Sequence, residues 1–192
     1  MKELIVVTGP VHAEKSTKAC QIARRFTRLA FNVMLVRPRC SIRAHERPGR
    51  LVTKNGLEFP SVDVDMVDEI EPAAEAQEAS VVWVDEPALF PDEPYLFTVI
   101  QRLRQRLPMI VSGLSATSEI QPFGQSMPRL LAVADRVIVL RADCDFCGHF
   151  DSATRSMCLV PKDGQVLVGG AETYKAACQD CWEMQTANPS PR

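Results

Sequence analysis

The sequence has 192 residues, of which 46% are hydrophobic, and a formal net charge of −2 at pH 7. This length suits one α/β domain with a small appendage, and the near-neutral charge argues against a nucleic-acid partner. No apolar run approaches the roughly 20 residues of a membrane span, and the N-terminus leads directly into a strand rather than a signal peptide. We therefore expect a soluble, cytoplasmic protein that binds neither nucleic acid nor a membrane.

Short apolar runs alternate with helical segments through residues 1–141. We expect strands at 4–7, 33–36, 62–67, 81–84, 109–112 and 136–140, and helices at 15–29, 71–80, 95–106 and 123–134. The polar segment 37–50 reads as a loop with most of its five arginines in solvent, and Asn55-Gly56 indicates a turn. This alternation predicts an α/β fold in which helices cover both faces of a parallel sheet.

The first strand and the first helix are joined by a loop that resembles a phosphate-binding loop. Gly9, Lys15 and Ser16 nearly fit the pattern G-x-x-x-x-G-K-[ST], but Glu14 occupies the second glycine position. Backbone N–H groups at a helix N-terminus bind phosphate, while the lysine can reach phosphate oxygens and the serine can bind Mg²⁺. The pattern favours a P-loop NTPase-like sheet that binds ATP and Mg²⁺. The alternative is an ordinary strand–helix turn with a surface lysine.

Two acidic residues, Asp85 and Glu86, follow the buried strand expected at 81–84. In open α/β sheets, ligands bind at the carboxyl ends of the strands. One acid there can hold Mg²⁺, and a second can act as a general base toward a hydroxyl group. In the alternative interpretation, Asp85 caps a helix and Glu86 lies on the surface.

Four of the seven cysteines form two C-x-x-C pairs, Cys144/Cys147 and Cys178/Cys181, separated by the thirty residues 148–177. Four thiolates fit a tetrahedral, structural Zn²⁺ site, although reduced core cysteines are the alternative. The zinc would tie both ends of the intervening loop, which could close over a substrate. The sequence therefore predicts an α/β nucleotide-binding domain at 1–141, a small zinc-binding lasso domain at 142–184 and a disordered tail at 185–192.

The order of these features, from about residue 4 to residue 182, resembles the zinc-containing thymidine kinases of the cellular and poxviral type. The landmarks that carry the resemblance are the phosphate loop, the segment Asp85-Glu86-Pro87-Ala88-Leu89-Phe90-Pro91-Asp92, the tripeptide Pro122-Phe123-Gly124 and the segment 168–174 before the second cysteine pair. The family transfers the γ-phosphate of ATP to the 5′-hydroxyl of thymidine or deoxyuridine with Mg²⁺, and its members are usually homotetramers.

The resemblance implies a role for each matching position. Glu86 would be the catalytic base toward the 5′-hydroxyl. The ATP and Mg²⁺ positions would be Gly9, Pro10, Lys15, Ser16, Thr17, Asp85 and Arg43. The nucleoside positions would be Phe123, Thr154, Val168 and Tyr174, with the last three on the lasso.

Several positions depart from the family pattern, and most of them fall at the expected site. They are Glu14 for glycine, Ser41 and Ser115 for acids, Ala88 for glutamine, Leu89 for an aromatic residue and Ser118 for phenylalanine. Two hypotheses follow: a deoxynucleoside kinase with a reshaped base pocket, or a catalytically impaired homologue that binds a nucleotide or a partner. A different P-loop ATPase with a zinc knuckle is a third, which the segment 168–174 disfavours.

Glu14 and His12 decide how this loop would treat phosphate. A carboxylate about 5 Å from one phosphate charge costs on the order of 3 kcal/mol at an effective dielectric constant near 20. Glu14 would avoid this cost by pointing to solvent, or by pairing with Lys15 or a loop arginine. His12 either contacts phosphate or, as we favour, fills the space of a family phenylalanine.

Overall fold

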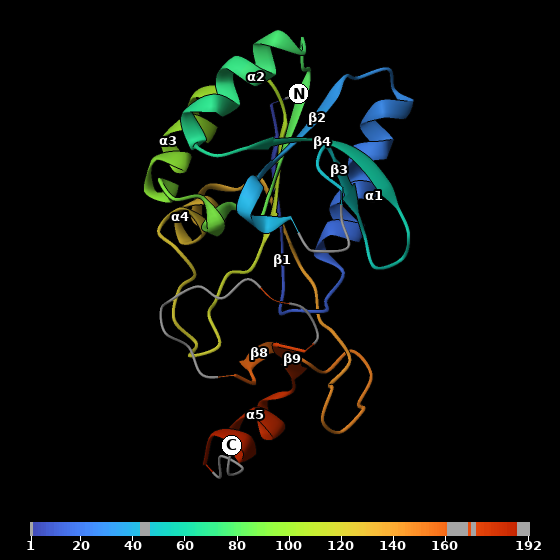
Figure 1. The fold of residues 1–192 in the computed structure, drawn as a ribbon, viewed down its shortest axis with the longest axis vertical. Helices are drawn as coiled ribbons and strands as arrows, with labels where there is room; N and C mark the ends of the chain where they lie inside the picture. Colours follow the sequence, from blue (N-terminus) through green and yellow to red (C-terminus); the bar gives the residue numbers. More distant parts are fainter. Residues whose placement is uncertain (1, 43–46, 161–168, 170–171, 188–192) are drawn as a thin grey trace.

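The computed structural model describes residues 2–42, 47–160, 169 and 172–187. A larger α/β body contains the sheet and most of the helices, and a smaller C-terminal unit lies at one end of its long axis (Figure 1). Within the described residues, none of the helices has the length and the apolar character needed to cross a bilayer.

Seven strands form the central sheet, in the order β3-β4-β2-β5-β6-β1-β7. Every neighbouring pair is parallel except β3 with β4. β1, β5 and β6 are buried along their whole length, as short apolar runs in a parallel sheet should be. The strands are β1 (Leu4–Thr8), β2 (Val33–Pro38), β3 (Arg50–Val52), β4 (Glu58–Val64), β5 (Val81–Asp85), β6 (Met109–Gly113) and β7 (Arg136–Val139).

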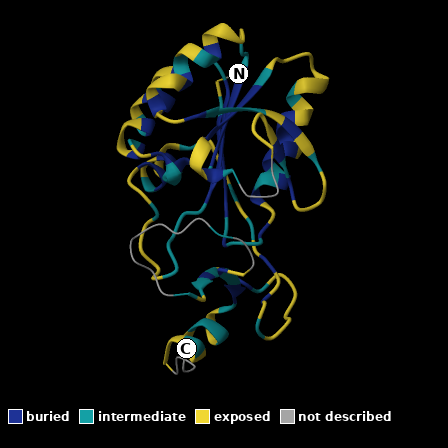
Figure 2. Cartoon of the chain, viewed as in Figure 1, coloured by how far each residue is buried: buried dark blue, intermediate teal, exposed yellow. Residues whose placement is uncertain are grey.

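Helices cover both faces of this sheet, as the alternation predicted. α1 (Lys15–Arg28) lies on one face, while α2 (Ile70–Ala76), α3 (Glu93–Leu103) and α4 (Ser126–Val133) lie on the other (Figure 1). Successive residues of β1 point to opposite faces. Leu4 and Val6 therefore pack with α2, α3 and α4, whereas Ile5 and Val7 pack with α1. The two layers bury the strands between them and leave the outer helix surfaces exposed (Figure 2).

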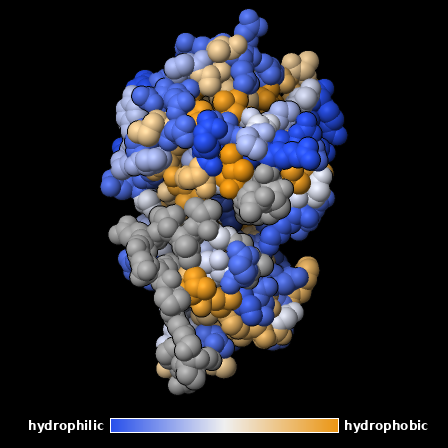
Figure 3. All heavy atoms as spheres, in the orientation of Figure 1, coloured by the Kyte–Doolittle hydropathy of each residue, from blue (hydrophilic) through white to orange (hydrophobic). Residues whose placement is uncertain are grey.

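The C-terminal unit contains an antiparallel pair, β8 (Arg155–Cys158) and β9 (Tyr174–Ala177), followed by α5 (Gln179–Ala187). Three short 3-10 helices, η1 (Arg39–Ser41), η2 (Val67–Glu69) and η3 (Pro87–Leu89), complete the described elements. On the face seen in Figure 3, hydrophilic residues predominate, and apolar residues form separate patches on both the body and the C-terminal unit.

Three expectations about the elements were wrong. Arg37 does not belong to a solvated loop: it is a buried residue of β2, and its Nε donates to Oδ1 of Asp63 on β4 at 2.9 Å. The strand expected at 62–67 lies earlier, at Glu58–Val64. Residues 185–187, expected in a disordered tail, belong to α5, which ends at Ala187; residues 188–192 lie outside the described part. The turn at Asn55-Gly56 is confirmed.

Candidate active site

The loop between β1 and α1 contains three residues with positive φ. Gly9 has a φ of +154°, and a Cβ there would lie 2.5 Å from the carbonyl oxygen of Leu140, so only glycine fits. His12 and Glu14 both have left-handed backbone conformations, with φ of 66° and 57°. Such conformations are costly for residues other than glycine and persist where the surroundings fix them.

Glu14 occupies the expected glycine position in a left-handed backbone conformation, with φ 57° and ψ 33°. It precedes the first residue of α1, and it is exposed. The carboxylate could point to solvent or pair with Lys15 or a loop arginine. Because Glu14 is exposed, the structure shows the first arrangement. Solvent screening weakens the repulsion of a bound phosphate.

Lys15 is the first residue of α1 and is 9% exposed. Its Nζ donates to the carbonyl oxygen of Pro10 at 2.8 Å, so the ammonium group lies back across the loop. This is not a surface lysine, which removes one feature of the alternative interpretation of the loop as an ordinary turn.

Asp85 ends β5 and sits in a buried hydrogen-bond network. Oγ of Ser16 lies 3.3 Å and 3.4 Å from its two carboxylate oxygens, and Oγ of Ser112, opposite it on β6, donates to Oδ1. Nε1 of Trp83 in turn donates to Oγ of Ser112 at 2.6 Å. Sequence reasoning missed Ser112 and Trp83, although Ser112 ends a neighbouring parallel strand and thus had to lie at the same edge of the sheet.

The network surrounds a carboxyl group that is costly to ionise. Burial and the nearby charge of Glu86 raise the pKa of Asp85 to about 7, against the opposing effects of Ser112, Lys15 and Arg37. A carboxylate beside a serine hydroxyl is an oxygen donor set that suits Mg²⁺. A bound cation would also favour the ionised form of Asp85.

Glu86 follows directly and is partly buried, with a left-handed backbone at φ 50° and ψ 54°. Its N–H donates to the carbonyl oxygen of Ser112 at 2.8 Å. The residue that precedes η3 is Glu86, so the alternative in which Asp85 caps a helix is wrong. The strained backbone holds the second acid at the carboxyl end of the sheet.

A cleft of about 290 Å³ opens beside the start of the phosphate loop. It brings Thr154 together with Gly9 and Pro10, which the sequence assigned to different ligands. Its other lining residues come from the segment after β6, the end of β7 and β8: Ser115, Ala116, Thr117, Ile120, Val139, Leu140, Arg141, Arg155 and Ser156.

The remaining nucleoside positions lie elsewhere or are not described. Phe123 is partly buried, and its N–H donates to the carbonyl oxygen of Ser115 at 3.0 Å. The next residue, Gly124, has a φ of +71° and faces the buried carboxylate of Glu93, which explains the glycine of this tripeptide. Tyr174 begins β9 opposite Cys158. Arg43 and Val168 lie outside the described residues.

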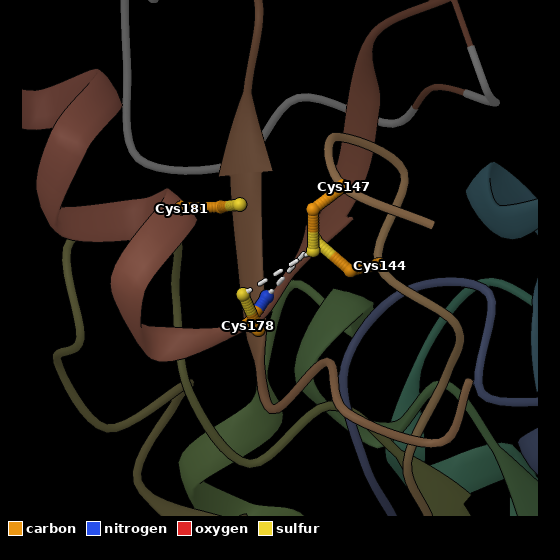
Figure 4. Close-up of side chains that lie close together, drawn as sticks. All are labelled: Cys144, Cys147, Cys178 and Cys181. Carbon is orange, nitrogen blue, oxygen red and sulfur yellow. Dashed lines mark hydrogen bonds between the residues drawn. The ribbon is translucent and has the colours of Figure 1, made fainter. Parts of the chain in front are cut away.

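The four cysteines of the two C-x-x-C pairs converge at one point (Figure 4). All four sulfur atoms lie within 4.8 Å of one another, and Sγ of Cys147 is 3.8 Å from Sγ of Cys178. A regular tetrahedron with Zn–S bonds of about 2.3 Å has an edge of about 3.8 Å, so the cluster fits structural zinc. Cys147 is exposed, which argues against the alternative of core cysteines.

The cysteine environment favours a thiolate at Cys144. Burial raises the pKa of this thiol, but backbone N–H groups of Cys147, Cys178 and Phe146 outweigh it and lower the pKa to about 6. The N–H of Cys178 lies 3.4 Å from Sγ of Cys144. Donors of this kind stabilise the charged form that binds a metal.

His12 makes a contact that neither interpretation of this residue anticipated. Its Nδ1 lies 2.9 Å from Oδ2 of Asp145, a residue of the first cysteine turn. Burial and the charge of Lys54 lower the pKa of His12, although Asp145 opposes them. The imidazole is therefore neutral at pH 7. The sequence did not indicate this contact, because 133 positions separate the two residues.

The sequence matches the family described as thymidine kinase over residues 2–182. A thymidine kinase of Roseiflexus sp. (strain RS-1) is 40% identical over 145 residues, covering 71% of this chain and 73% of that protein. A thymidine kinase of Coprothermobacter proteolyticus is 33% identical over 182 residues, covering 91% and 87%. The flagellar accessory protein FlaH from Methanocaldococcus jannaschii, at 14% identity and a TM-score of 0.51 over 72% of this chain and 70% of that one, shares the fold alone.

Proposed function

Because the chain belongs to the thymidine kinase family, we propose that it transfers the γ-phosphate of ATP to the 5′-hydroxyl of thymidine or a related pyrimidine deoxynucleoside. One observation carries the proposal: buried Lys15, Ser16 and buried Asp85 meet where the phosphate loop adjoins the end of β5. That is the edge at which open α/β sheets bind their ligands.

The phosphate loop would hold the triphosphate. Backbone N–H groups at the start of α1, those of Lys15, Ser16 and Thr17, would bind its oxygens. Lys15 would exchange its contact with Pro10 for a terminal phosphate oxygen. Ser16 and Asp85 would hold Mg²⁺, which supplies neutralisation of the phosphate charge.

Glu86 would accept the proton of the 5′-hydroxyl while the hydroxyl oxygen forms a bond to the γ-phosphorus. The bond from that phosphorus to the bridging oxygen breaks, and ADP leaves with the electron pair. The backbone bond from Glu86 to Ser112 holds this base in register with Asp85. Arg43, which lies outside the described residues, would stabilise the transferred charge.

The nucleoside would occupy the cleft beside the loop, where Thr154 faces Gly9 and Pro10. Phe123 and Tyr174 do not line this cleft, so they would contact the base only where it extends beyond the cleft. Val168, the fourth nucleoside position, lies outside the described residues. Ser118 and Leu89, which replace aromatic residues of the family pattern, would leave this pocket wider. We therefore expect the protein to accept more than one pyrimidine base.

The oligomeric state and the location in the cell are part of the same proposal. We expect a cytoplasmic homotetramer with one structural zinc ion per chain, as the family resemblance implies. Light scattering coupled to gel filtration gives the mass directly, and a monomer would contradict this expectation. Metal analysis of the same sample should give about one zinc per chain.

The reaction is tested by ADP formation with Mg·ATP and a panel of pyrimidine and purine deoxynucleosides. We expect turnover with thymidine or deoxyuridine, and a loss of roughly 10²- to 10⁴-fold in Glu86→Gln, which keeps the size of the side chain but cannot accept the proton. Absence of turnover across the panel, in protein that binds nucleotide, would instead support the catalytically impaired homologue. Equal turnover in Glu86→Gln would contradict the role given to this residue.

A further inference from the structure

The phosphate loop and the four-cysteine cluster are joined by a contact to which the proposed function gives no role. Nδ1 of His12 lies 2.9 Å from Oδ2 of Asp145, and the side chain of His12 is 18% exposed. Asp145 lies between Cys144 and Cys147 in the sequence. A residue of the loop that would hold phosphate is thus bonded directly to the turn that would hold zinc.

The neighbours of His12 in the loop also contact the C-terminal unit. The N–H of Val11 donates to Oγ of Ser156 on β8 at 3.0 Å. Ala13 is buried in the small core that contains Cys144 and Ala176. Three consecutive loop residues therefore rest on the C-terminal unit, which makes that unit part of the support for the loop.

Asp145 is itself fixed on its other side. Its N–H donates to the carbonyl oxygen of Ala176 at 2.9 Å, and the N–H of Ala176 donates back to Oδ2 of Asp145. Ala176 belongs to β9, which leads directly into Cys178. The carboxylate that holds His12 is thus positioned by segments carrying both cysteine pairs, and these segments come together where the four thiolates meet.

The loop has reason to depend on such support. His12 has a φ of 66°, and Glu14 a φ of 57°. Conformations of this kind persist only when surrounding contacts hold them. Losing the contact to Asp145 would therefore let the backbone of the loop relax away from this conformation.

We propose that His12 and Asp145 are positioning residues that couple the two sites, so that zinc at the four cysteines strengthens binding of a nucleoside triphosphate by the loop. Coupling between two ligands is reciprocal. Nucleotide therefore strengthens zinc binding by the same factor, for which we expect roughly fivefold to tenfold. The nucleotide half of this proposal rests on the proposed function, whereas the link between the loop and the cysteine turn does not.

The test measures zinc affinity by equilibrium competition with a chelator, with and without a saturating, non-hydrolysable Mg·ATP analogue. Protein-free blanks correct for zinc bound by the analogue. In the wild type, nucleotide should raise zinc affinity roughly fivefold to tenfold. His12→Ala and Asp145→Ala should each abolish this gain, and the double variant should show no further loss. His12→Asn should keep the gain, because its amide N–H can replace Nδ1 and asparagine accepts a positive φ.

A matched control separates positioning from general damage to the metal centre. Nδ1 of His149 lies 3.3 Å from Sγ of Cys147, so this histidine is close to the cluster but does not bridge to the loop. His149→Ala should lower zinc affinity while preserving the gain produced by nucleotide. Circular dichroism of every variant checks that the fold is retained.

The outcomes also separate this proposal from the proposed function. If calorimetry shows that the analogue binds wild type without raising zinc affinity, or if His12→Ala keeps the gain, the coupling is overturned. If the analogue does not bind at all, the proposed function fails, and the zinc measurements alone decide the link. His12→Ala and Asp145→Ala must then lower zinc affinity non-additively; additive or absent effects overturn it.

Discussion

The sheet body and the C-terminal unit of this protein are stabilised by different means. The body buries large side chains on both faces of its sheet, among them Trp83, Leu96 and Ile110. The core of the C-terminal unit consists of alanines and one cysteine, and α5 has no buried residue. An alanine contributes little buried apolar area, so packing alone stabilises this unit weakly. A metal bound at the four cysteines must supply most of what holds it.

The difference also shows what each kind of site demands of the chain. The metal centre needs four similar side chains at short spacing, and the ion itself brings them into register. The candidate phosphate loop contains residues with positive φ and adjoins a carboxyl group whose pKa burial raises to about 7, and the packed sheet holds both in place. The body can do this because its core is large.

Zinc removal should have the largest effect, which should reach the C-terminal unit and the loop residues that rest on it but not the sheet. Structural zinc contributes on the order of 10 kcal/mol in small domains. We expect Cys178→Ser, or a strong chelator, to expose the amides of β8 and β9 to rapid hydrogen exchange while those of β1, β5 and β6 stay protected. Cys158→Ser, which changes a cysteine outside the cluster, should leave exchange unaltered. Global unfolding after zinc loss would break the contrast between the two units.

Ion pairs within the sheet body should differ in how much they contribute to the free energy of unfolding, because that contribution depends on how deeply each pair is buried. The pair Arg37–Asp63 has side chains only 1% and 4% exposed, whereas Arg39–Asp65, two residues along, is 52% and 66% exposed. Removing one partner of a buried pair costs about 3–5 kcal/mol, against about 0–1 kcal/mol for an exposed pair.

Urea unfolding of Arg37→Met, on β2, and Arg39→Met, just after β2, compares the two pairs. We expect the first to lose several kcal/mol and the second almost nothing. Similar losses of stability in both variants would mean that the sheet around Arg37 is less tightly packed than the rest of the body.

Asp85 should lower the stability of the ligand-free protein at neutral pH, although the proposed kinase activity requires it. Its pKa is raised to about 7 in the fold, so the unfolded chain loses the proton first as pH rises. Stability from the protonated form is complete below about pH 4 and falls by about 1.4 kcal/mol per pH unit until about pH 7. Asp85→Asn should therefore raise the melting temperature of the ligand-free protein more at pH 8 than at pH 5, while abolishing kinase activity. Equal gains at both pH values would contradict the ionisation cost.

Local patterns in the sequence predicted the parts of the fold that depend on neighbouring residues. Apolar runs located β1, β5 and β6, and the cysteine spacing located the metal centre, because both signals are complete within a few positions. Residues whose partners lie far along the chain were misread or missed. Arg37 read as solvated because Asp63 lies 26 positions away, and nothing local linked His12 to Asp145.

Substitution of Glu14 should have the smallest effect. It tests whether the backbone conformation of the phosphate loop is set by the loop's own residues or by the structure that packs against it. Its left-handed backbone costs about 1 kcal/mol that glycine would not incur. Glu14→Gly should therefore stabilise the protein by about that amount and raise nucleotide affinity a few-fold by removing a charge that solvent already screens. Glu14→Gln removes the charge but keeps a non-glycine residue in the strained backbone conformation. It should therefore raise nucleotide affinity without raising the melting temperature. If both variants melt at the wild-type temperature, the backbone strain contributes nothing measurable, and the loop is held entirely by what packs against it.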